Sequence, residues 1–352
     1  MIQLKKWLKK PRIFLLIPLT IILLAIWIMF LLKKDIITDK SEQKEIFATK
    51  DYKLNQFYQE RATKRNEEKD YEGAIDDYRK AIFYDTSMIE VNTILYEIQQ
   101  IKYLYSLLDK EQEGYRISIK ILDSLIETNP TEYYFTTRAQ YKFATENFLS
   151  SIQDYKSAKK LCECDNEDYF WNIGSAHQEL NQYFEAIQYY NEAIQIKKDK
   201  YNKASKDMKE IYGRDIQKLY RNNGNCKKEL RDFEGAILDF KKGLSWGVNS
   251  SIFESEIYNG IGACQIELKN YQAAIVSLNF SLKMNNESNT IYSGENTKTG
   301  LTLKYPDMAY TYYLLGVAKF NLNQKRLACR DWGKAGDLGE ERGYKAIQEY
   351  CQ

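Results

Sequence analysis

The residue types that most often carry catalysis or bind metals are few in this chain of 352 residues, and their spacing matches no reaction. A single histidine, His177, leaves almost no room for a Ser-His-Asp triad or a three-His metal site. Cys162 and Cys164 could begin a zinc site, but no second pair follows at zinc-ligand spacing. We therefore expect no metal and no cofactor.

Acid–base chemistry is the remaining possibility, because the chain has 49 Asp and Glu residues. Nearly all of them fall on helix faces that we expect to stay in water. There is no Gly-rich phosphate loop, no nucleophile elbow and no His-Glu-x-x-His motif. We assign no catalytic residue and expect the chain not to be an enzyme.

The charge distribution also argues against a nucleic-acid-binding protein. The 51 basic residues include seven in the first 34 positions, where no acidic residue occurs. The rest of the chain therefore carries more acidic than basic residues. Binding to a phosphate backbone needs clustered positive charge, so we expect no nucleic-acid partner.

Residues 13–32 form an uncharged, strongly apolar run that follows a basic segment, 1–12. A helix of that length spans a hydrocarbon core of roughly 30 Å, so we expect one transmembrane helix that anchors the protein. A cleaved signal peptide is the alternative. It would need a small-x-small cleavage pattern, which residues 31–35 do not offer.

The side of the membrane on which the rest of the chain lies depends on the flanking charges. Five basic residues precede the span, and Lys33, Lys34, Lys40 and Lys44 follow it. This small excess favours a cytoplasmic N-terminus. The span would then anchor the protein in a bacterial inner membrane, and a linker, 33–50, would lead to a soluble part in the periplasm. A soluble part in the cytoplasm is the alternative.

A repeated pattern of small and aromatic residues fills the chain after the linker. Its clearest copy, residues 168–197, has Phe170, Ile173 and Gly174 in one amphipathic helix, then Ala186 and Tyr190 in a second. Glycines recur at the same place in three later copies, at Gly224, Gly262 and Gly316. Small residues let two antiparallel helices approach closely, and aromatic residues fill the space beside them.

This spacing resembles the tetratricopeptide repeat. The resemblance implies an all-α, right-handed solenoid of helical hairpins, because each hairpin leaves an apolar face that only a neighbouring hairpin can cover. We count about seven hairpins in residues 51–340 and a capping helix in 341–352. The small residues of the second helices are expected at the following positions: Ala74, Ser118, Ser151, Ala186, Ala236, Ala274 and Ala328.

Two intervals between these positions are long enough to contain insertions. Residues 198–218 are charged and poor in helix breakers, so they should extend two helices. Residues 286–305 are polar and contain Gly294 and Gly300, so they should form a loop, with a short β-hairpin as one possibility.

The cysteines and the histidine fit the repeat as packing residues. Cys226 and Cys264 lie two residues after the contact glycine, where sister repeats have alanine, so we expect them to be buried. His177 should pack on the inner face of a first helix. We expect Cys329 and Cys351 to be free thiols, with a disulfide as the alternative in an oxidising compartment.

In the family that the chain resembles, the first helices of successive hairpins line a groove that holds an extended peptide or a partner helix. The matching candidates here are the following residues: Trp171, Asn172, Ser175, Arg221, Asn225, Asn259 and Tyr313. Trp171 could instead pack against a neighbouring repeat. The family subtype that clamps a C-terminal carboxylate is excluded, because Gly260, Tyr310 and Leu314 stand where it needs polar or basic residues.

The sequence therefore predicts a membrane-anchored scaffold of the bacterial envelope that binds a partner protein or peptide. The alternative is an enzyme or small-ligand sensor with a polar pocket inside the solenoid. Buried carboxylates converging on a closed cavity would favour that alternative.

Overall fold

The computed structural model describes residues 51–84, 91–162, 166–246, 251–292 and 306–351. These residues are helical apart from short turns, and they contain no strand. After a first helix over residues 51–67, the helices are α2 (Tyr71–Tyr84), α3 (Val91–Leu107), α4 (Glu111–Thr128), α5 (Glu132–Ala144), α6 (Phe148–Cys162), α7 (Glu167–Glu179), α8 (Tyr183–Lys203), α9 (Lys206–Glu229), α10 (Phe233–Trp246), α11 (Ser251–Glu267), α12 (Tyr271–Tyr292), α13 (Pro306–Asn321), α14 (Lys325–Asp337) and α15 (Glu341–Tyr350).

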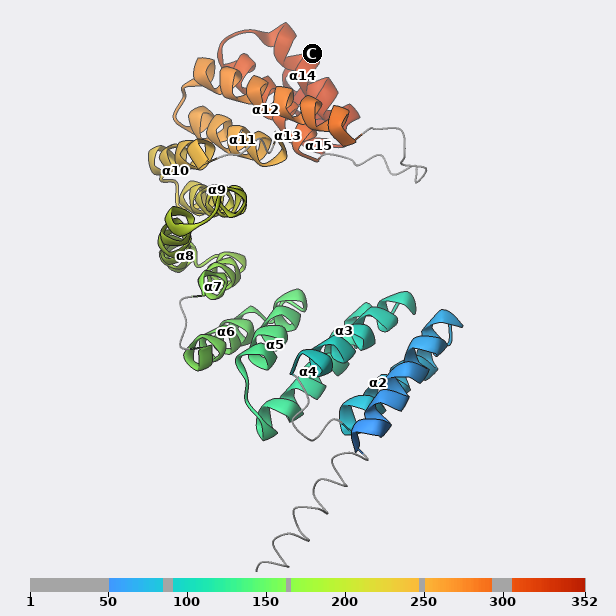
Figure 1. The fold of residues 1–352 in the computed structure, drawn as a ribbon. Helices are drawn as coiled ribbons and strands as arrows, with labels where there is room; N and C mark the ends of the chain where they lie inside the picture. The colour runs from blue at the N-terminus through green and yellow to red at the C-terminus, as the bar shows by residue number, and fades with distance from the viewer. Residues whose placement is uncertain (1–50, 85–90, 163–165, 247–250, 293–305, 352) are drawn as a thin grey trace, which may run out of the picture. The chain divides into compact units, whose positions relative to one another are not determined.

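The chain divides into two compact units at Gly114, within α4. In the first unit, the side chain of Asn55 is buried and donates to the backbone oxygen of Ala81 on α2 and to Glu97 on α3. In the second unit, each helix from α5 to α14 lies beside the helix that follows it in the chain (Figure 1). Both units are therefore built from consecutive, locally packed helices.

The same turn closes each helical hairpin in the described residues. One non-glycine residue in each turn has a positive φ angle, and these residues are Lys69, Asp109, Glu146, Asn181, Arg231, Lys269 and Asn323. At Lys269, for example, the amide donates to Ile266, and the next amide donates to Gln265. This pair of hydrogen bonds is the Schellman arrangement, which satisfies the last carbonyls of the first helix.

The turns correct the expected register of one hairpin. In the other hairpins a small residue follows the positive-φ residue by five positions, as Ala186 follows Asn181. The turn at Asp109 puts Gly114 in that place, whereas the sequence pattern suggested Ser118. A Cβ atom on Gly114 would lie 2.7 Å from the Cβ atom of Tyr105, so close contact with the preceding helix explains the glycine.

Apolar clusters join each hairpin of the second unit to the next one. One cluster contains Phe170 from α7, Tyr190 from α8, and Ile216, Leu219 and Tyr220 from α9. Its members come from two successive hairpins, so neither hairpin could bury this surface alone. The stacking expected from the sequence is therefore confirmed for these hairpins.

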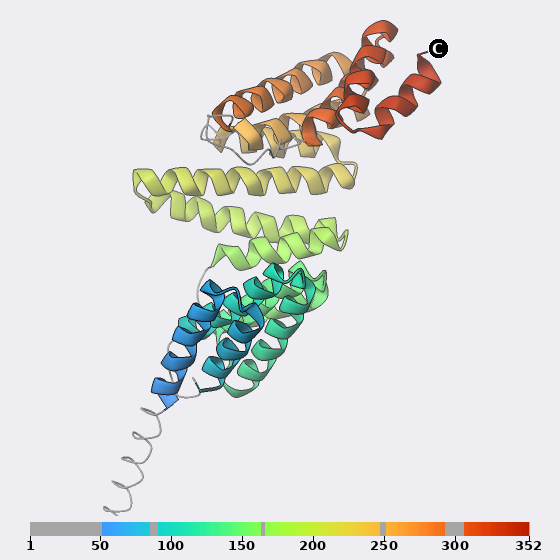
Figure 2. The same ribbon diagram turned by 90° about the vertical axis from the view of Figure 1, so that its right-hand side faces the viewer.

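The two predicted insertions have different outcomes. Helix α8 continues to Lys203 and α9 begins at Lys206, so residues 198–218 extend two helices as expected (Figure 2). The prediction of a loop from residue 286 is wrong at its start, because α12 continues to Tyr292. Residues 286–292 have no glycine or proline to stop the helix. Residues 293–305 lie outside the described residues.

The predicted N-terminal segments, 1–12, 13–32 and 33–50, also lie outside the described residues. Among the helices that are described, none has the length and apolar composition to cross a membrane. Helix α15 occupies residues 341–350, at the position predicted for a capping helix, and it packs against α14.

Candidate functional site

A pocket of about 410 Å³ lies between the first helices of two successive hairpins, α5 and α7, in the second unit. Trp171 and Asn172, two of the predicted groove residues, line it. The other lining residues are Glu132, Tyr133, Thr136, Gln140, Asn166, Asp168 and Tyr169. The first helices of two successive hairpins therefore line this pocket.

Local capping fixes the ends of both helices beside the pocket. The Thr131 hydroxyl accepts a hydrogen bond from the amide of Tyr134 at 3.2 Å, and the Asn166 side chain accepts one from Asp168 at 3.0 Å. These bonds satisfy amides that have no partner within the helix. The pocket is thus held by two well-defined helix starts.

Trp171 is half-buried and has two kinds of neighbour. Its ring packs against the apolar cluster that joins α7, α8 and α9. The Nζ atoms of Lys197 and Lys218 lie 5.8 and 5.9 Å from the ring centroid. Trp171 therefore packs on the next hairpin and also lines the pocket.

A buried ionic network holds the α7 end of the pocket. The Nζ atom of Lys197, whose side chain is 4% exposed, lies 3.1 Å from Glu167, 3.0 Å from Asp215 and 3.6 Å from Asp168. Burial opposes the charge of Lys197, but Asp215, Glu167 and Asp168 outweigh burial and raise its pKa. Both nearby helices, α8 and α9, are thus fixed to the start of α7.

Glu167 is the carboxylate at the centre of this network. Burial opposes its negative charge, but hydrogen bonds from Lys200 and from its own backbone, together with the charge of Lys197, hold its pKa below the ordinary value. A buried charge is tolerated only when it is paired and hydrogen-bonded. Glu167 meets that condition.

Other predicted groove residues are engaged within the protein. Arg221 forms an ion pair with Glu256 of α11, and its guanidinium carbon lies 5.4 Å from the ring centroid of Phe253. The Ser175 hydroxyl accepts a hydrogen bond from Tyr190 at 3.3 Å. Asn225 is half-buried on α9. Arg221 and Ser175 therefore connect helices within the protein.

The last two candidates lie away from the pocket. Asn259 is only 6% exposed, because α11 is packed against both α12 and α13. Tyr313 stacks with Tyr310 on α13, and the guanidinium of Arg342 lies 4.8 Å from its ring. A residue of the capping helix α15 therefore contacts Tyr313. The repeat pattern could not indicate this contact, because α15 lies outside the repeats.

The repeat contains an ion pair that the sequence reasoning missed. In four hairpins an aspartate of the second helix pairs with a Lys or Arg of the first helix, and the aspartate is at most 4% exposed. The Lys or Arg stands four positions before the turn residue with the positive φ angle. The pairs are Arg65–Asp77, Lys142–Asp154, Lys227–Asp239 and Lys319–Asp331. The sequence signal was an aspartate three residues after the small residue of the second helix and directly before a large aromatic residue.

His177 occupies the cation position of this pair in its own hairpin. Its ring stacks on Tyr189, which has the place of the aspartate, with centroids 5.3 Å apart. Its Nδ1 atom lies 2.7 Å from the Gln182 side chain in the turn. The predicted packing role of His177 is therefore confirmed, and its partners are an aromatic ring and the turn.

The two thiols expected to be buried, Cys226 and Cys264, are both buried and free. Burial raises the pKa of each thiol to about 12. Because the thiolate is the reactive form, these thiols are inert at neutral pH.

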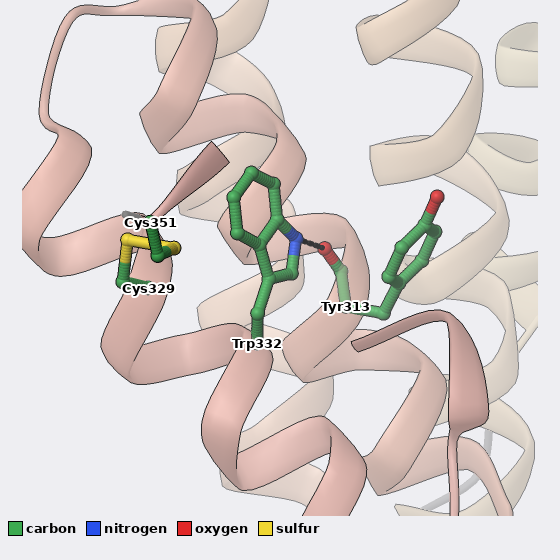
Figure 3. The surroundings of a disulfide bond; sticks show 4 residues. All are labelled: Tyr313, Cys329, Trp332 and Cys351. Atoms are coloured by element: carbon green, nitrogen blue, oxygen red, sulfur yellow. Dashed lines mark hydrogen bonds between the residues drawn. A yellow bond between two sulfur atoms is a disulfide. The ribbon is translucent and has the colours of Figure 1, made fainter. Parts of the chain in front are cut away.

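The other described cysteines are oxidised, which contradicts the expectation of free thiols at the C-terminus. Cys329 on α14 and Cys351 after α15 form a disulfide (Figure 3). Cys162 is also disulfide-bonded, so its thiolate is not available to a zinc ion. In the part of the chain that the structure describes, no group of three potential metal ligands comes together.

The sequence has a Gly-x-Ser-x-Gly pattern at residues 243–247, of which the structure describes residues 243–246. Ser245 lies in the last turn of α10, and its hydroxyl donates to the backbone oxygen of Lys242 at 2.7 Å. A nucleophile elbow requires a sharp turn between a strand and a helix.

Comparison with known proteins supports the fold. Residues 167–200, which contain α7 and most of α8, match a family model described as tetratricopeptide repeat. The apo form of RapI is 15% identical, with a TM-score of 0.59 over 85% of this chain and 82% of that one. The C-terminal part of a TPR repeat-containing protein from Cytophaga hutchinsonii is 15% identical, with a TM-score of 0.52 over 82% and 98%. No curated protein matches the sequence. The chain thus has an all-helical, TPR-like solenoid fold.

Proposed function

We propose that this protein is a membrane-anchored scaffold that binds an extended segment of a partner protein between the first helices of its hairpins. The observation that carries the proposal is the pocket between α5 and α7, which contains the half-buried ring of Trp171 and the 53% exposed ring of Tyr133. Aromatic side chains at the centre of a concave surface are frequent anchors of protein interfaces.

The anchor is residues 13–32, and the hairpins face an oxidising compartment outside the cytoplasm. The apolar run and its basic flank support the anchor. The Cys329–Cys351 disulfide supports the compartment, since disulfides persist mainly where the environment is oxidising. Alkaline phosphatase fused after Gln352 should be active, and a fluorescent protein fused there should be dark. The reverse result would place the hairpins in the cytoplasm.

Site-specific photo-crosslinking tests the groove in intact cells. A photoreactive phenylalanine analogue at Tyr133 should give a discrete crosslinked product that disappears when Trp171→Ala is added. The matched control is the same analogue at Phe184 on α8, which is 64% exposed and does not line the pocket. Equal products at both positions, or no effect of Trp171→Ala, would refute binding in this pocket.

The alternative function, an enzyme or small-ligand sensor, is favoured by one observation. The pocket volume of about 410 Å³ falls in the range of roughly 300–1,000 Å³ that is usual for small-molecule sites. Its carboxylates are not buried, however, because the side chain of Asp168 is 64% exposed. The charges therefore do not converge in a water-excluding cavity, and this geometry favours the scaffold.

A further inference from the structure

The charges that line the pocket between α5 and α7 are all negative. Of its nine lining residues, all within the described part of the chain, Glu132 and Asp168 are acidic and none is basic. The remaining polar lining groups are hydroxyls and amides, which carry no net charge. An occupant with a positive charge would therefore meet complementary charge.

The nearest lysine does not neutralise both carboxylates. Lys197 lies 3.6 Å from Asp168, but it is closer to Glu167 and Asp215, and its side chain is almost fully buried. Lys200 pairs with Glu167, on the same side of the network. Asp168 thus shares one buried cation with two other carboxylates and keeps an exposed face toward water.

The helix starts beside the pocket do not reverse this balance. An uncapped helix N-terminus attracts anions, because its first amides have no partners. Here Thr131 and Asn166 accept hydrogen bonds from such amides, and acidic residues occupy the first turns of both helices. These features satisfy the positive helix ends from within the protein.

Aromatic rings complete the lining. The 53% exposed ring of Tyr133 lines the pocket from α5, and Trp171 lines it from α7. Aromatic faces attract ammonium and guanidinium groups, and the attraction adds to that of a carboxylate. The Nζ atoms of Lys197 and Lys218 already lie 5.8 and 5.9 Å from the Trp171 ring centroid, so the exposed ring of Tyr133 offers the aromatic face for a further cation. Two carboxylates and the Tyr133 ring suit the head of a Lys or Arg side chain, while Trp171 accommodates its methylene stem.

We infer that this pocket selects a Lys or Arg side chain of the bound partner segment, recognised by Glu132 and Asp168 together with Tyr133 and Trp171. The inference rests on the proposed function and adds the chemistry of the partner. It implies that binding weakens as salt concentration rises, because exposed charges are screened.

The experiment uses the full chain in detergent micelles and an array of immobilised random dodecapeptides. The strongest binder is synthesised with a fluorescent label, both as found and with its Arg or Lys replaced by the neutral analogue citrulline or norleucine. Fluorescence anisotropy then measures the affinity of both peptides for the wild type, for a Glu132→Gln, Asp168→Asn variant, and for Trp171→Ala. The matched control is Glu185→Gln, Glu192→Gln, which removes two exposed carboxylates of α8 outside the pocket.

We expect the array binders to be enriched in Lys and Arg. Replacing the peptide's Arg or Lys by its neutral analogue should weaken binding at least tenfold to the wild type and to the Glu185→Gln, Glu192→Gln control. The same replacement should weaken binding to the Glu132→Gln, Asp168→Asn variant less than about twofold. The inference would be overturned if the array binders carried no Lys or Arg, or if neutralising the peptide weakened binding to the Glu132→Gln, Asp168→Asn variant as much as binding to the wild type. If the inference failed in this way but Trp171→Ala still weakened the binding of these peptides, the proposed binding of a partner segment in the pocket would remain supported. If no peptide preferred the wild type over Trp171→Ala, the proposed function and the inference would both fail.

Discussion

At the scale of residues, a buried aspartate joins the two helices of four hairpins. Each of these carboxylates is placed beside a large buried ring, such as Tyr155 next to Asp154. A buried ion pair adds less to stability than its geometry suggests, since both groups lose water, but removal of one partner leaves a costly charge. These pairs therefore fix which helix faces meet more than they add net stability.

Asp154→Ala should lower the free energy of unfolding by about 3 kcal/mol, because it leaves two largely buried cations without their shared carboxylate. Lys142 lies 2.8 Å from Asp154, and Arg138 lies 2.7 Å from it. Urea denaturation followed by circular dichroism measures the loss. Asp76→Ala, which breaks an exposed pair with Lys80, is the control and should leave the midpoint almost unchanged. Equal midpoints for the two variants would contradict the structural role of the buried pair.

Glu167 should make stability depend on pH in the acid range. Its folded pKa lies below the ordinary value, so its contribution is complete above its unfolded pKa, about 4.3, and is lost as the pH falls through the folded pKa. Glu167→Gln should therefore have a lower urea midpoint than the wild type at pH 7. The difference should shrink at pH 3, and a difference that stayed constant from pH 7 to pH 3 would exclude this coupling.

At the scale of elements, close helix contacts and one recurring turn define every hairpin. The sequence indicated the contacts directly, because Gly174, Gly224 and Gly262 stand where a Cβ atom would collide with a side chain of the paired helix. It did not indicate the turn geometry, since charged residues and asparagine occupy the positive-φ position instead of glycine. It also gave the wrong register near Asp109, where Ser118 and Gly114 are both small.

Gly224→Ala should destabilise the protein by about 1–3 kcal/mol through overpacking. The added Cβ atom would lie 2.6 Å from the Cε1 atom of Phe240, which is fully buried and has no room to move. Gly333→Ala is the matched control, because its Cβ atom would lie 3.9 Å from Ile347. That variant should gain about 0.5–1 kcal/mol from the higher helix propensity of alanine. Thermal unfolding compares the two, and effects of the same sign would refute the contact.

Lys269→Gly should raise the free energy of unfolding by about 0.5–1 kcal/mol, because glycine adopts a positive φ angle without the steric cost of a side chain. Lys269 has a φ angle of 58° and lies in the turn between α11 and α12. Lys269→Ala keeps the Cβ atom and removes the charge, so it should be close to neutral. If alanine stabilised the protein as much as glycine, the gain would come from charge and not from the backbone.

At the scale of the whole molecule, the sequence predicted the features that depend on local residue spacing. It did not predict contacts between residues of different hairpins. Fold class, hairpin positions and the extended helices followed from residue spacing, because each repeat packs on its neighbours in sequence. The Trp171 pocket was half predicted: Trp171 and Asn172 were found, whereas Glu132 and Tyr133 belong to a hairpin whose first helix has a weaker pattern. The contacts of Arg221 with Glu256, and of Tyr313 with Arg342, depend on the next hairpin and the cap.

The Cys329–Cys351 disulfide ties the end of the capping helix to the last hairpin across 22 positions of sequence. Near it, the indole of Trp332 donates to the backbone oxygen of Tyr313 at 3.2 Å (Figure 3). The Trp332 ring also contacts the rings of Tyr350 and Phe320. Ala346 and Ile347 of α15 pack against Ala328 and Trp332 of α14, so α15 covers an apolar face of the last described hairpin.

Cys351→Ser should therefore destabilise the protein locally before it unfolds globally. A bridge of this length contributes about 3 kcal/mol by restricting the unfolded chain. Because α15 packs mainly against α14, the loss should appear as faster amide hydrogen exchange in α14 and α15, while α7 and α8 keep their protection. Reduction of the wild type would also open the disulfide of Cys162 at the end of α6, so the substitution and not reduction isolates the effect of the cap. Equally faster exchange in α7 and α8 would instead show that the cap stabilises the whole array, and unchanged exchange in α15 would show that packing around Trp332 holds it without the disulfide.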